Sequence, residues 1–432
     1  MSGSTIFALS SGAGPSAIGV IRVSGPGARD AATTLAGDCP PPRRATLRAI
    51  RDPASGEEID RALLIFFPGP RSVTGEDLLE IHVHGGRAVV AAVERALAEL
   101  PGFVAARAGE FTWRAFDNGK MDLLEVEGLG DLLQAETEAQ RRHAMAVAQG
   151  GLSARINDWQ QRILVIGALI ESRLDFADED DVATIDVDVE ARAMMAALES
   201  ELSLMLSRPP AEPLRQGVHV VIGGPPNAGK STLLNRLVER DAAIVSDIAG
   251  TTRDLIEVPA VIEGIAYRFT DTAGLRDESD DPIERIGIDR ATAALAGADI
   301  LLWLGDDPPP RTGDHVLHIH ARSDFLGRRA RPAHVDLAIS AVTGEGMAEL
   351  IARLGMMARS LMPRGDETLL NRRQRDAVSA VAAHLRAADS VGDDLIRAEH
   401  MRLARARFDA LTGRAGTEDM LDALFGAFCI GK

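Results

Sequence analysis

One short segment constrains the fold of this chain more than any other. Residues 224–231 read Gly-Pro-Pro-Asn-Ala-Gly-Lys-Ser, a complete GxxxxGK[ST] pattern. An apolar, strand-like run at 218–222 precedes it, and a helix-forming stretch at 231–240 follows it. In this order, the backbone N–H groups of the turn and the positive end of the helix point at one anion. The segment therefore predicts a phosphate-binding loop in an α/β domain, with a plain glycine-rich turn as the alternative.

Residues in and after this loop have the chemistry of a Mg²⁺–nucleotide site. Lys230 would reach the β- and γ-phosphates, and the Ser231 hydroxyl would bind Mg²⁺. Thr252 is a second candidate Mg²⁺ ligand. Farther along, Asp271 can hold the metal through water, and the N–H of Gly274 can sense a γ-phosphate.

Two later segments are placed to read a base. Asp324 and the pair Ser340-Ala341 follow apolar runs at 316–319 and 335–339. An aspartate accepts both the N1–H and the exocyclic amine of guanine, which adenine lacks, so the expected nucleotide is GTP. The usual guanine signature Asn-Lys-x-Asp reads Ala-Arg-Ser-Asp here, at 321–324. We expect guanine preference to survive with weaker affinity for the base.

Hydrolysis needs a group that orients water. Many small GTPases carry a glutamine after Asp-Thr-Ala-Gly, but this chain has Leu275, which cannot position water. The acidic stretch 277–284 is the nearest source of a carboxylate.

Length and composition restrict the class of protein. A chain of 432 residues indicates two or three domains, and 46% hydrophobic residues suffice for their cores. The net charge of −17 argues against broad nucleic-acid coating, so an RNA partner would need a local basic patch, such as Arg141-Arg142 or Arg372-Arg373 with Arg375.

The cysteines and the apolar runs bear on location. The two cysteines, Cys39 and Cys429, form no CxxC pattern, which favours a reducing compartment. The first ten residues lack the pattern of a signal peptide, and the longest apolar stretch, 163–170, is too short for a membrane span. These features predict a cytoplasmic protein without a membrane partner.

Periodicity divides the chain into a multidomain α/β plus all-α architecture. Short β-branched runs at 19–23, 62–67 and 78–83 alternate with helical stretches such as 86–97. The predicted parts are a mixed α/β domain (1–119), a helical domain (120–212), an inserted Ras-like P-loop GTPase domain with a mostly parallel sheet (213–363), and the second part of the helical domain (364–432). Two independent helical bundles are the alternative.

Several motifs resemble one family over nearly the whole length. They are Ser-Thr-Ile-Phe-Ala at 4–8, Gly-Val-Ile-Arg-Val-Ser-Gly at 19–25, Thr-Gly-Glu-Asp-Leu-Leu-Glu-Ile-His-Val-His-Gly-Gly at 74–86, Gly-Glu-Phe-Thr-Trp-Arg-Ala-Phe at 109–116, and Phe-Cys-Ile-Gly-Lys at 428–432. The chain resembles the MnmE (TrmE) family of tRNA modification GTPases. A terminal Cys-x-Gly-Lys behind an inserted GTPase is more specific than the phosphate loop alone.

The resemblance implies a homodimer formed through the N-terminal domain, which binds a one-carbon folate such as 5-formyltetrahydrofolate. It also implies a flavin-dependent partner, MnmG (GidA), in a heterotetramer or larger complex. Together they would install an aminomethyl or carboxymethylaminomethyl group at carbon 5 of the wobble uridine (U34) of certain tRNAs. The implied folate contacts are Arg22, Glu80, Lys120 and Lys432, with Cys429 as a catalytic thiol.

The resemblance also implies how hydrolysis is activated. Two GTPase domains pair in the presence of K⁺, which takes the electrostatic role of an arginine finger. The implied K⁺ contacts are Asn227, Ser246, Ile248 and Thr251, and Glu284 is the catalytic carboxylate that orients water. The predicted GTP-binding residues are Asn227, Ala228, Gly229, Lys230, Ser231, Thr232, Ser246, Thr251, Thr252, Asp271, Thr272, Ala273, Gly274, Asp324, Ser340 and Ala341.

Alternatives remain at this point. A ribosome-assembly or signalling GTPase would share the phosphate loop and K⁺ dependence, whereas it has no need of a thiol and a one-carbon carrier. Folate bound as a purely structural ligand is a third possibility. His82 and His84 alternate along a predicted strand, but a metal site would need a third ligand.

Overall fold

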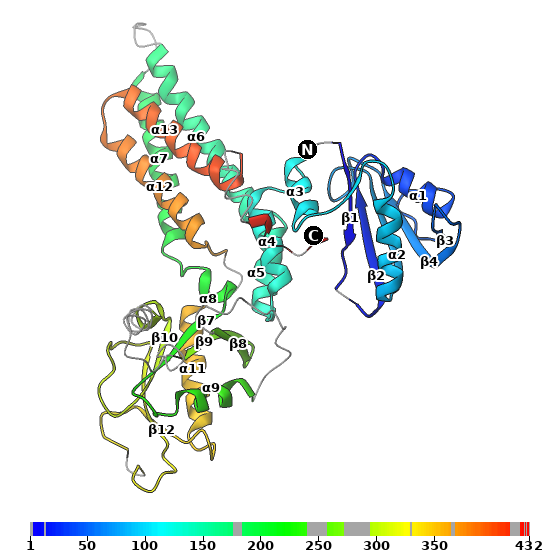
Figure 1. Ribbon diagram of the computed structural model, residues 1–432. Helices are drawn as coiled ribbons and strands as arrows, with labels where there is room; N and C mark the ends of the chain where they lie inside the picture. Colours follow the sequence, from blue (N-terminus) through cyan, green and yellow to red (C-terminus); the bar gives the residue numbers. More distant parts are fainter. Residues whose placement is uncertain are drawn as a thin grey trace, which may run out of the picture. The chain divides into compact units, whose positions relative to one another are not determined.

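The structure, a computed structural model, describes most of the chain. The described residues are 3–12, 14–175, 184–239, 257–271, 294–328, 331–363, 368–414, 424–426, 428 and 430–431. They belong to two units, which are described separately below (Figure 1). The first unit comprises Met1–Gly130, Val147–Ser153 and Asp409–Lys432, and the second comprises Asp131–Ala146 and Ala154–Phe408. The functional boundaries near residues 120, 213 and 364 stay predictions.

The first unit contains a six-stranded mixed sheet in the order β3-β4-β5-β2-β1-β6. Its strands are β1 (Thr5–Leu9), β2 (Ser16–Ser24), β3 (Thr46–Arg51), β4 (Glu58–Phe67), β5 (Leu78–Gly85) and β6 (Phe103–Ala105). Neighbouring strands are antiparallel except for β1 and β6, which are parallel. The predicted runs 19–23, 62–67 and 78–83 lie inside β2, β4 and β5.

The alternation of side chains along the strands determines what each face of this sheet carries. Ile21, Val23, Leu79 and Ile81 point to one face, where helices α1 (Ala28–Ala36) and α2 (Arg87–Ala98) cover them. Burial of each such side chain contributes roughly 1.5–3 kcal/mol. Arg22 and Glu80 have the opposite parity and therefore lie on the other face, which we call the polar face. The helix predicted at 86–97 corresponds to α2.

The rest of the first unit packs around α3 (Glu110–Asp117) and the described part of the chain's end. Phe111 of α3 is buried with Ile6, Ala8 and Ala106. The described tail joins this unit through aromatic contacts and an isolated β-bridge between Ala108 and Ile430. Residues more than 300 positions apart in the sequence are thereby held together.

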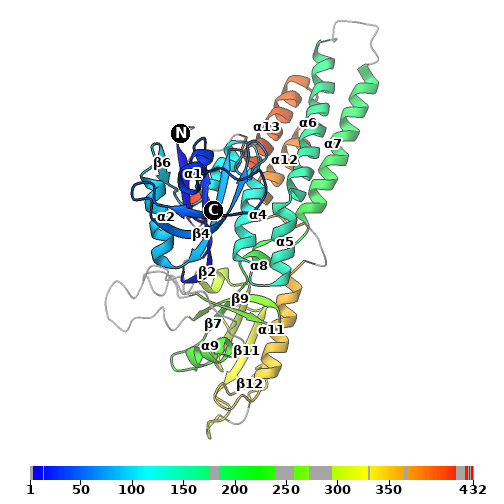
Figure 2. The ribbon, with the colours of Figure 1, turned by 90° about the vertical axis from the view of Figure 1, so that its right-hand side faces the viewer.

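Helices dominate the 123–215 and 372–412 segments, as predicted. They are α4 (Leu123–Gln134), α5 (Glu138–Ala148), α6 (Gly151–Asp175), α7 (Thr184–Leu206), α8 (Glu212–Arg215), α12 (Arg372–Ser390) and α13 (Asp394–Thr412). Helices α6, α7, α12 and α13 lie side by side in Figures 1 and 2. Trp159 of α6 stacks on Phe408 of α13 at 5.7 Å between ring centroids. Among the described residues, we find no helix with the length and apolar character of a membrane span.

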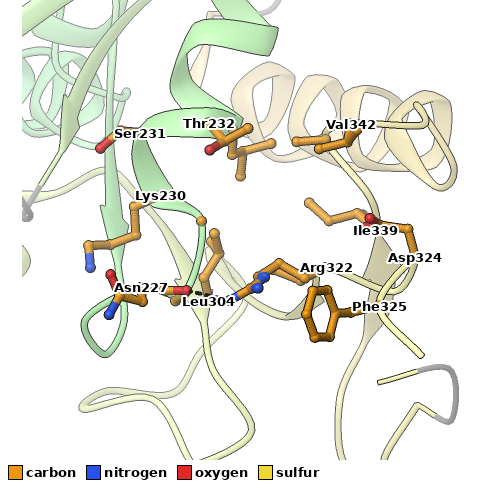
Figure 3. Close-up of a pocket in the computed structure, with 15 residues that line it drawn as sticks. Asn227, Lys230, Ser231, Thr232, Leu304, Arg322, Asp324, Phe325, Ile339 and Val342 are labelled. Atoms are coloured by element: carbon orange, nitrogen blue, oxygen red, sulfur yellow. Dashed lines mark hydrogen bonds between the residues drawn. The ribbon is translucent and has the colours of Figure 1, made fainter. Parts of the chain in front are cut away.

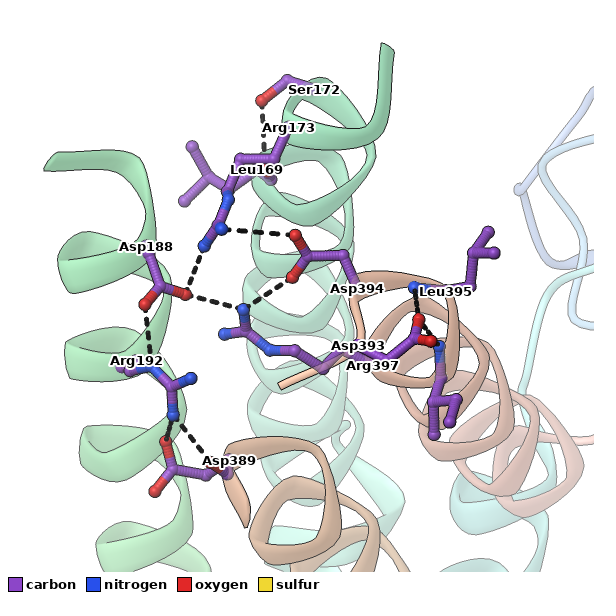
Figure 4. A network of polar contacts seen from close by, with 11 residues as sticks. Leu169, Ser172, Arg173, Asp188, Arg192, Asp389, Asp393, Asp394, Leu395 and Arg397 are labelled. Carbon is purple, nitrogen blue, oxygen red and sulfur yellow. Dashed lines mark hydrogen bonds and ion pairs between the residues drawn. The ribbon is translucent and has the colours of Figure 1, made fainter. Parts of the chain in front are cut away.

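A charged network ties α6, α7 and α13 together near one end of the bundle (Figure 4). Arg397 is only 1% exposed, and its Nη1 lies 2.6 Å from Asp188 and 2.8 Å from Asp394. Arg173 of α6 also pairs with Asp188. Burial alone would raise the pKa of Asp188, but hydrogen bonds from Arg192 and Arg397 lower it to about 2. The carboxylate therefore stays ionised and neutralises the buried guanidinium.

A second six-stranded sheet carries the phosphate-loop motif. Its strands are β7 (Val218–Gly223), β8 (Glu257–Ile262), β9 (Ile265–Asp271), β10 (Ile300–Leu304), β11 (Val316–Ala321) and β12 (Leu337–Ile339), in the order β12-β11-β10-β7-β9-β8. Every pairing is parallel except that of β8 with β9. The mostly parallel sheet predicted for this block is confirmed.

Two helices cover one face of this sheet, and the strand sequences explain why. Helices α9 (Lys230–Glu239) and α11 (Met347–Leu361) share a core with β7 residues such as Val220 and Ile222. The intervening Val221 points to the opposite face, where Ala294, Ala298 and Leu301 pack. Central strands are buried on both sides, which accounts for their nearly continuous apolar runs.

The chain enters and leaves this sheet block at one place. The N–H of Ala211 donates to the carbonyl of Leu370 at 3.1 Å. The Arg375 guanidinium donates to the carbonyls of Leu206 and Arg208 at 2.6 and 2.9 Å. We call these contacts the neck. They hold the two connecting segments together although about 160 residues separate them in the sequence.

Candidate functional site

The phosphate loop, residues 224–231, has a backbone that only certain residues can adopt. It leaves β7 at Gly223 and enters α9 at Lys230. Gly224 has φ +145°, and a Cβ there would overlap the Leu304 carbonyl. Gly229 and Asn227 also have positive φ, at +94° and +59°. Glycine and asparagine are the residues that tolerate such backbone angles, so the motif's spacing follows from the loop's shape.

Lys230 and Ser231 occupy the start of α9, and the N-terminus of a helix favours the binding of an anion. Lys230 is 6% exposed, and its Nζ donates to the carbonyls of Gly224 and Pro225 at 3.1 and 2.9 Å. The Ser231 hydroxyl donates to Asp271 Oδ2 at 2.5 Å. Asp271 ends β9, directly beside β7 in the sheet. The hydroxyl and the carboxylate predicted near Mg²⁺ therefore lie in contact.

The phosphate loop opens into a pocket of about 820 Å³ (Figure 3). The predicted residues that line it are Asn227, Ala228, Gly229, Lys230, Ser231, Thr232, Asp324 and Ala341. Lining residues that the sequence did not single out for this purpose include Leu304, Phe325, Ile339 and Val342. Ser340, also predicted, is fully buried, and its Oγ accepts from the Thr343 N–H, so it shapes the adjacent turn.

The segment that follows β11 brings Asp324 to the pocket. We call residues 322–327 the base-reading loop. Arg322 has φ +61°, and its Nη1 donates to the Asn227 carbonyl of the phosphate loop at 3.1 Å. Its guanidinium lies 4.8 Å from the centre of the Phe325 ring, which is 57% exposed. Arg322, which stands where the usual signature has lysine, therefore connects the base-reading loop with the phosphate loop.

Other predicted site residues lie outside the described residues. They are Ser246, Ile248, Thr251, Thr252, Thr272, Ala273, Gly274, Glu284, Cys429 and Lys432.

A polar cluster lies on the polar face of the first sheet. Arg22 of β2 and Glu80 of β5 are direct register partners, and Arg22 Nε donates to Glu80 Oε1 at 2.9 Å. His82 Nε2 lies 3.2 Å from the other oxygen of Glu80. Burial alone would raise the pKa of Glu80, but hydrogen bonds from His82 and Arg22 hold it below its ordinary value. The cluster therefore holds the Glu80 carboxylate between the Arg22 guanidinium and the His82 ring.

Lys120 belongs to the same unit and is exposed. It follows α3, and its Cε would lie 3.1 Å from a Cβ placed on Gly75. The loop around Gly75 also contacts Ser24, whose hydroxyl bonds to Thr74 and Glu76. Ser24 lies two residues after Arg22 on the polar face, so this loop connects the surroundings of Lys120 with those of Arg22.

The described part of the tail reaches the same sheet. Gly431 has φ +94°, and a Cβ there would overlap the Leu9 carbonyl at the end of β1. In the register of β1 with β2, Ala8 lies opposite Arg22. The residue before the chain's last position is therefore close to the strands that carry the Arg22–Glu80 pair.

His84 and three arginines of the candidate basic patches have partners within the protein. His84 Nδ1 lies 2.8 Å from Asp60 Oδ1, and the described residues contain no cluster of three or more His, Cys, Asp or Glu suited to a metal ion. Arg141 and Arg142 both pair with Glu138. Arg375 is occupied in the neck.

Comparison with known proteins gives full-length matches. The family described as the GTP-binding protein TrmE N-terminus matches residues 5–120, and the MnmE helical domain matches residues 123–429. The tRNA modification GTPase MnmE of Novosphingobium aromaticivorans is 52% identical over 435 residues, 99% of each chain. That of Rhizorhabdus wittichii is 54% identical over 430 residues, 99% of this chain and 96% of the relative.

A solved structure, the G domain of the T. maritima FeoB iron transporter, is 22% identical and covers 33% of this chain and 98% of its own, with a TM-score of 0.24. The identification comes from the two family matches and from the relatives that are more than half identical over almost the entire chain. The chain belongs to the MnmE (TrmE) family of tRNA modification GTPases.

Proposed function

We propose that the protein hydrolyses GTP in the pocket of the phosphate loop and uses this reaction in the modification of tRNA. The observation that carries the proposal is the contact between Ser231 and Asp271 beside a buried Lys230, with Asp324 lining the same pocket. These groups have the chemistry to bind Mg²⁺, phosphate and a purine base.

Each group has a role that follows from its chemistry. The backbone N–H groups of the phosphate loop and Lys230 would bind the β- and γ-phosphates. Mg²⁺, when bound, would neutralise phosphate charge, with Ser231 and Thr252 as ligands and Asp271 acting through water. Asp324 would accept two hydrogen bonds from guanine, and Ala341 would lie beside the base.

Activation of hydrolysis requires groups from outside the described residues. We assign the water-orienting role to Glu284 and the K⁺ contacts to Ser246, Ile248 and Thr251, together with Asn227. The described Asn227 supports the assignment, since it lies at the tip of the phosphate loop and lines the pocket. Pairing of two GTPase domains around K⁺ would then drive conformational change.

The polar face is the proposed site for a one-carbon folate such as 5-formyltetrahydrofolate. Arg22 and Lys120 can pair with the carboxylates or the polar ring atoms of a folate, and Glu80 can accept from its amino group. The approach of Gly431 to β1 supports the participation of the tail, including Lys432 and the thiol of Cys429.

The remaining assignments concern the assembly. We infer that the protein forms a homodimer through its N-terminal domain and acts in the cytoplasm with the flavin-dependent MnmG. The substrate would be U34 of certain tRNAs, modified at carbon 5 with an aminomethyl or carboxymethylaminomethyl group. A ribosome-assembly or signalling GTPase is the alternative, and no described residue favours it specifically.

Exchange of one carboxylate tests the nucleotide assignment. Asp324→Asn should weaken GTP binding about 100-fold and improve XTP binding, because the amide can donate to the xanthine oxygen that replaces the guanine amine. Asp307→Asn, outside the pocket lining, serves as the control and should leave both affinities unchanged. Equal GTP affinity in Asp324→Asn and the parent protein would remove Asp324 from the site.

Mass spectrometry of nucleosides from total tRNA tests the pathway. Deletion of the gene should abolish 5-aminomethyl-type uridines, and re-expression of a Cys429→Ser variant should fail to restore them. An unchanged nucleoside profile on deletion would favour the alternative GTPase class. Restoration by Cys429→Ser would remove the thiol from the chemistry while leaving the pathway assignment intact.

A further inference from the structure

Helix α3 and its C-terminal end present three polar side chains to one loop of the first unit. Glu110, Arg114 and Asn118 follow one another at intervals of four residues, so they share one face. This face meets residues 72–77, the segment directly before β5, which we call the 72–77 loop. Asn118 Nδ2 donates to the carbonyl of Thr74 at 2.8 Å, and Arg114 Nη1 donates to Glu76 Oε2 at 3.0 Å. The position of this loop is therefore determined by α3.

Arg114 makes most of these contacts and is almost fully buried, with 5% of its surface exposed. Its Nη1 also donates to the carbonyl of Ser4 at 3.0 Å, and its Nη2 lies 3.2 Å from Glu110 Oε1. A buried guanidinium is costly unless carboxylates neutralise it, and here Glu76 of the loop and Glu110 of the helix do so. The planar fork of an arginine serves several acceptors at once, whereas the ammonium group of a lysine is a single point charge. The full set of contacts therefore requires an arginine.

Glu76 connects Arg114 with strand β2. Its Oε2, which accepts from Arg114, also accepts from the Ser24 hydroxyl at 2.8 Å. The Ser24 hydroxyl lies 2.8 Å from the hydroxyl of Thr74, and both residues are fully buried. Ser24 ends β2, two residues after Arg22. One carboxylate thus joins the buried guanidinium to the strand that carries Arg22.

Lys120 follows the same end of α3. Its backbone N–H donates to the carbonyl of Ala115 at 2.7 Å, so its backbone is fixed to the last turn of the helix. Its side chain passes the 72–77 loop at Gly75, where a Cβ would lie 3.1 Å from Lys120 Cε and 2.9 Å from Asn118 Cβ. The loop is therefore close to Lys120 on the helix side, while it is hydrogen-bonded to Ser24 on the strand side.

We propose that Arg114 is a positioning residue for the folate site: by holding Glu76, it fixes the 72–77 loop and, through this loop, the placement of Lys120 relative to Arg22. The inference rests on the proposed folate site and adds a residue that does not itself contact the ligand. A folate is an extended molecule with a ring system at one end and carboxylates at the other. Two cations that bind different parts of it must keep a set separation, which requires support from the residues behind them.

An arginine that only stabilised the fold would make the same contacts, so the test must separate ligand placement from stability. Arg397 of α13 provides the matched control, because it is 1% exposed and also pairs with two carboxylates, those of Asp188 and Asp394. It belongs to the other unit. Substitution of either arginine by lysine should lower the midpoint of thermal unfolding, whereas only Arg114→Lys should affect the binding of folate.

The test is calorimetric titration of the full chain with 5-formyltetrahydrofolate. Arg114→Lys should lower the affinity about tenfold, the effect of one hydrogen bond to a charged group, and Arg397→Lys should leave it unchanged. The loss should nearly disappear when Arg114→Lys is combined with Lys120→Ala, because a residue that acts through Lys120 then has nothing left to position.

The outcomes separate the inference from the site. Wild-type affinity in Arg114→Lys, together with weakened binding in Lys120→Ala and Arg22→Ala, would overturn the positioning role and leave the folate site in place. An equal loss from Arg114→Lys with and without Lys120 would also overturn it. Wild-type affinity in all three single variants would overturn both the site and the inference. If circular dichroism shows that Arg114→Lys is unfolded, Glu76→Gln replaces it, since the neutral amide no longer pairs with the guanidinium, and the same outcomes apply.

Discussion

The two proposed ligand sites of this protein are built from different groups. The proposed nucleotide pocket depends on the backbone of the phosphate loop, which has positive φ angles at Gly224 and Gly229. The polar face is formed by side chains, with Arg22 and Glu80 paired across two antiparallel strands. A backbone site needs particular residues at fixed spacing along a short segment. A side-chain site needs only suitable polar side chains on one face of a sheet.

The largest effect on the nucleotide site is expected from a substitution of Lys230. In Lys230→Ala, we expect GTP affinity to fall about 100-fold and hydrolysis to be lost, because a charge-assisted contact to phosphate disappears. Fluorescent-nucleotide titration and phosphate release measure both effects. Lys120→Ala is the reciprocal control, which should bind GTP normally and formyl-folate weakly. Normal GTP affinity in Lys230→Ala would remove the Lys230 side chain from the nucleotide site.

The second largest effect is expected at Arg22. Arg22→Ala should weaken binding of 5-formyltetrahydrofolate about 20-fold, since it removes a cation and leaves Glu80 without one partner. Calorimetry with the full chain measures this affinity. Arg61→Ala, on a neighbouring strand and 71% exposed, provides the control. Equal folate affinity in wild type and Arg22→Ala would exclude the polar face as the folate site.

The tail should have a smaller effect. Gly431→Ala places a Cβ against the Leu9 carbonyl at a positive φ, so the tail must move. We expect folate affinity to drop about tenfold, with GTP binding unchanged. Gly426→Ala tests a tail glycine around which a Cβ would meet no atom within 4 Å. If the two alanine variants bind folate equally, the approach of the tail to β1 has no part in the site.

The smallest predicted effect concerns stability and pH. The pKa of Glu80 is lowered in the folded protein, so its contribution is complete above the ordinary value of 4.5 and is lost as the pH falls through the folded-state pKa. Glu80→Gln should therefore be about 1 kcal/mol less stable than wild type at neutral pH, with the difference shrinking in acid. Urea unfolding at several pH values measures it. A constant difference down to about pH 3 would contradict the pairing.

The same contrast explains what could be predicted from the sequence. The phosphate loop, its flanking strand and helix, and the parallel sheet followed from residue spacing, because a loop at a strand end is defined by neighbours in the chain. Arg22 and Glu80 are 58 residues apart, and only the family resemblance brought them together. Phe325, which lines the pocket, was missed, since an aromatic residue after Asp324 has no distinctive spacing.

Lysine usage is a signal that could have found part of the side-chain site. Among the 47 basic residues, only Lys120, Lys230 and Lys432 are lysines, and all three are predicted ligand contacts. Arginine serves elsewhere, as in the Arg397 network, where its planar fork suits paired carboxylates. Because almost all basic residues of this chain are arginines, a lysine marks a position where a compact positive charge is required.

The neck, finally, makes the nucleotide-binding block separable from the rest of the chain. Its entry and exit are hydrogen-bonded neighbours, Ala211 to Leu370, so the block could be excised and the bundle rejoined by a short linker. The ends of the excised block would likewise lie close enough for circular permutation. An insertion that returns to its starting point adds a new activity without separating the helices on either side, which is how such a module can be gained, lost or exchanged between proteins.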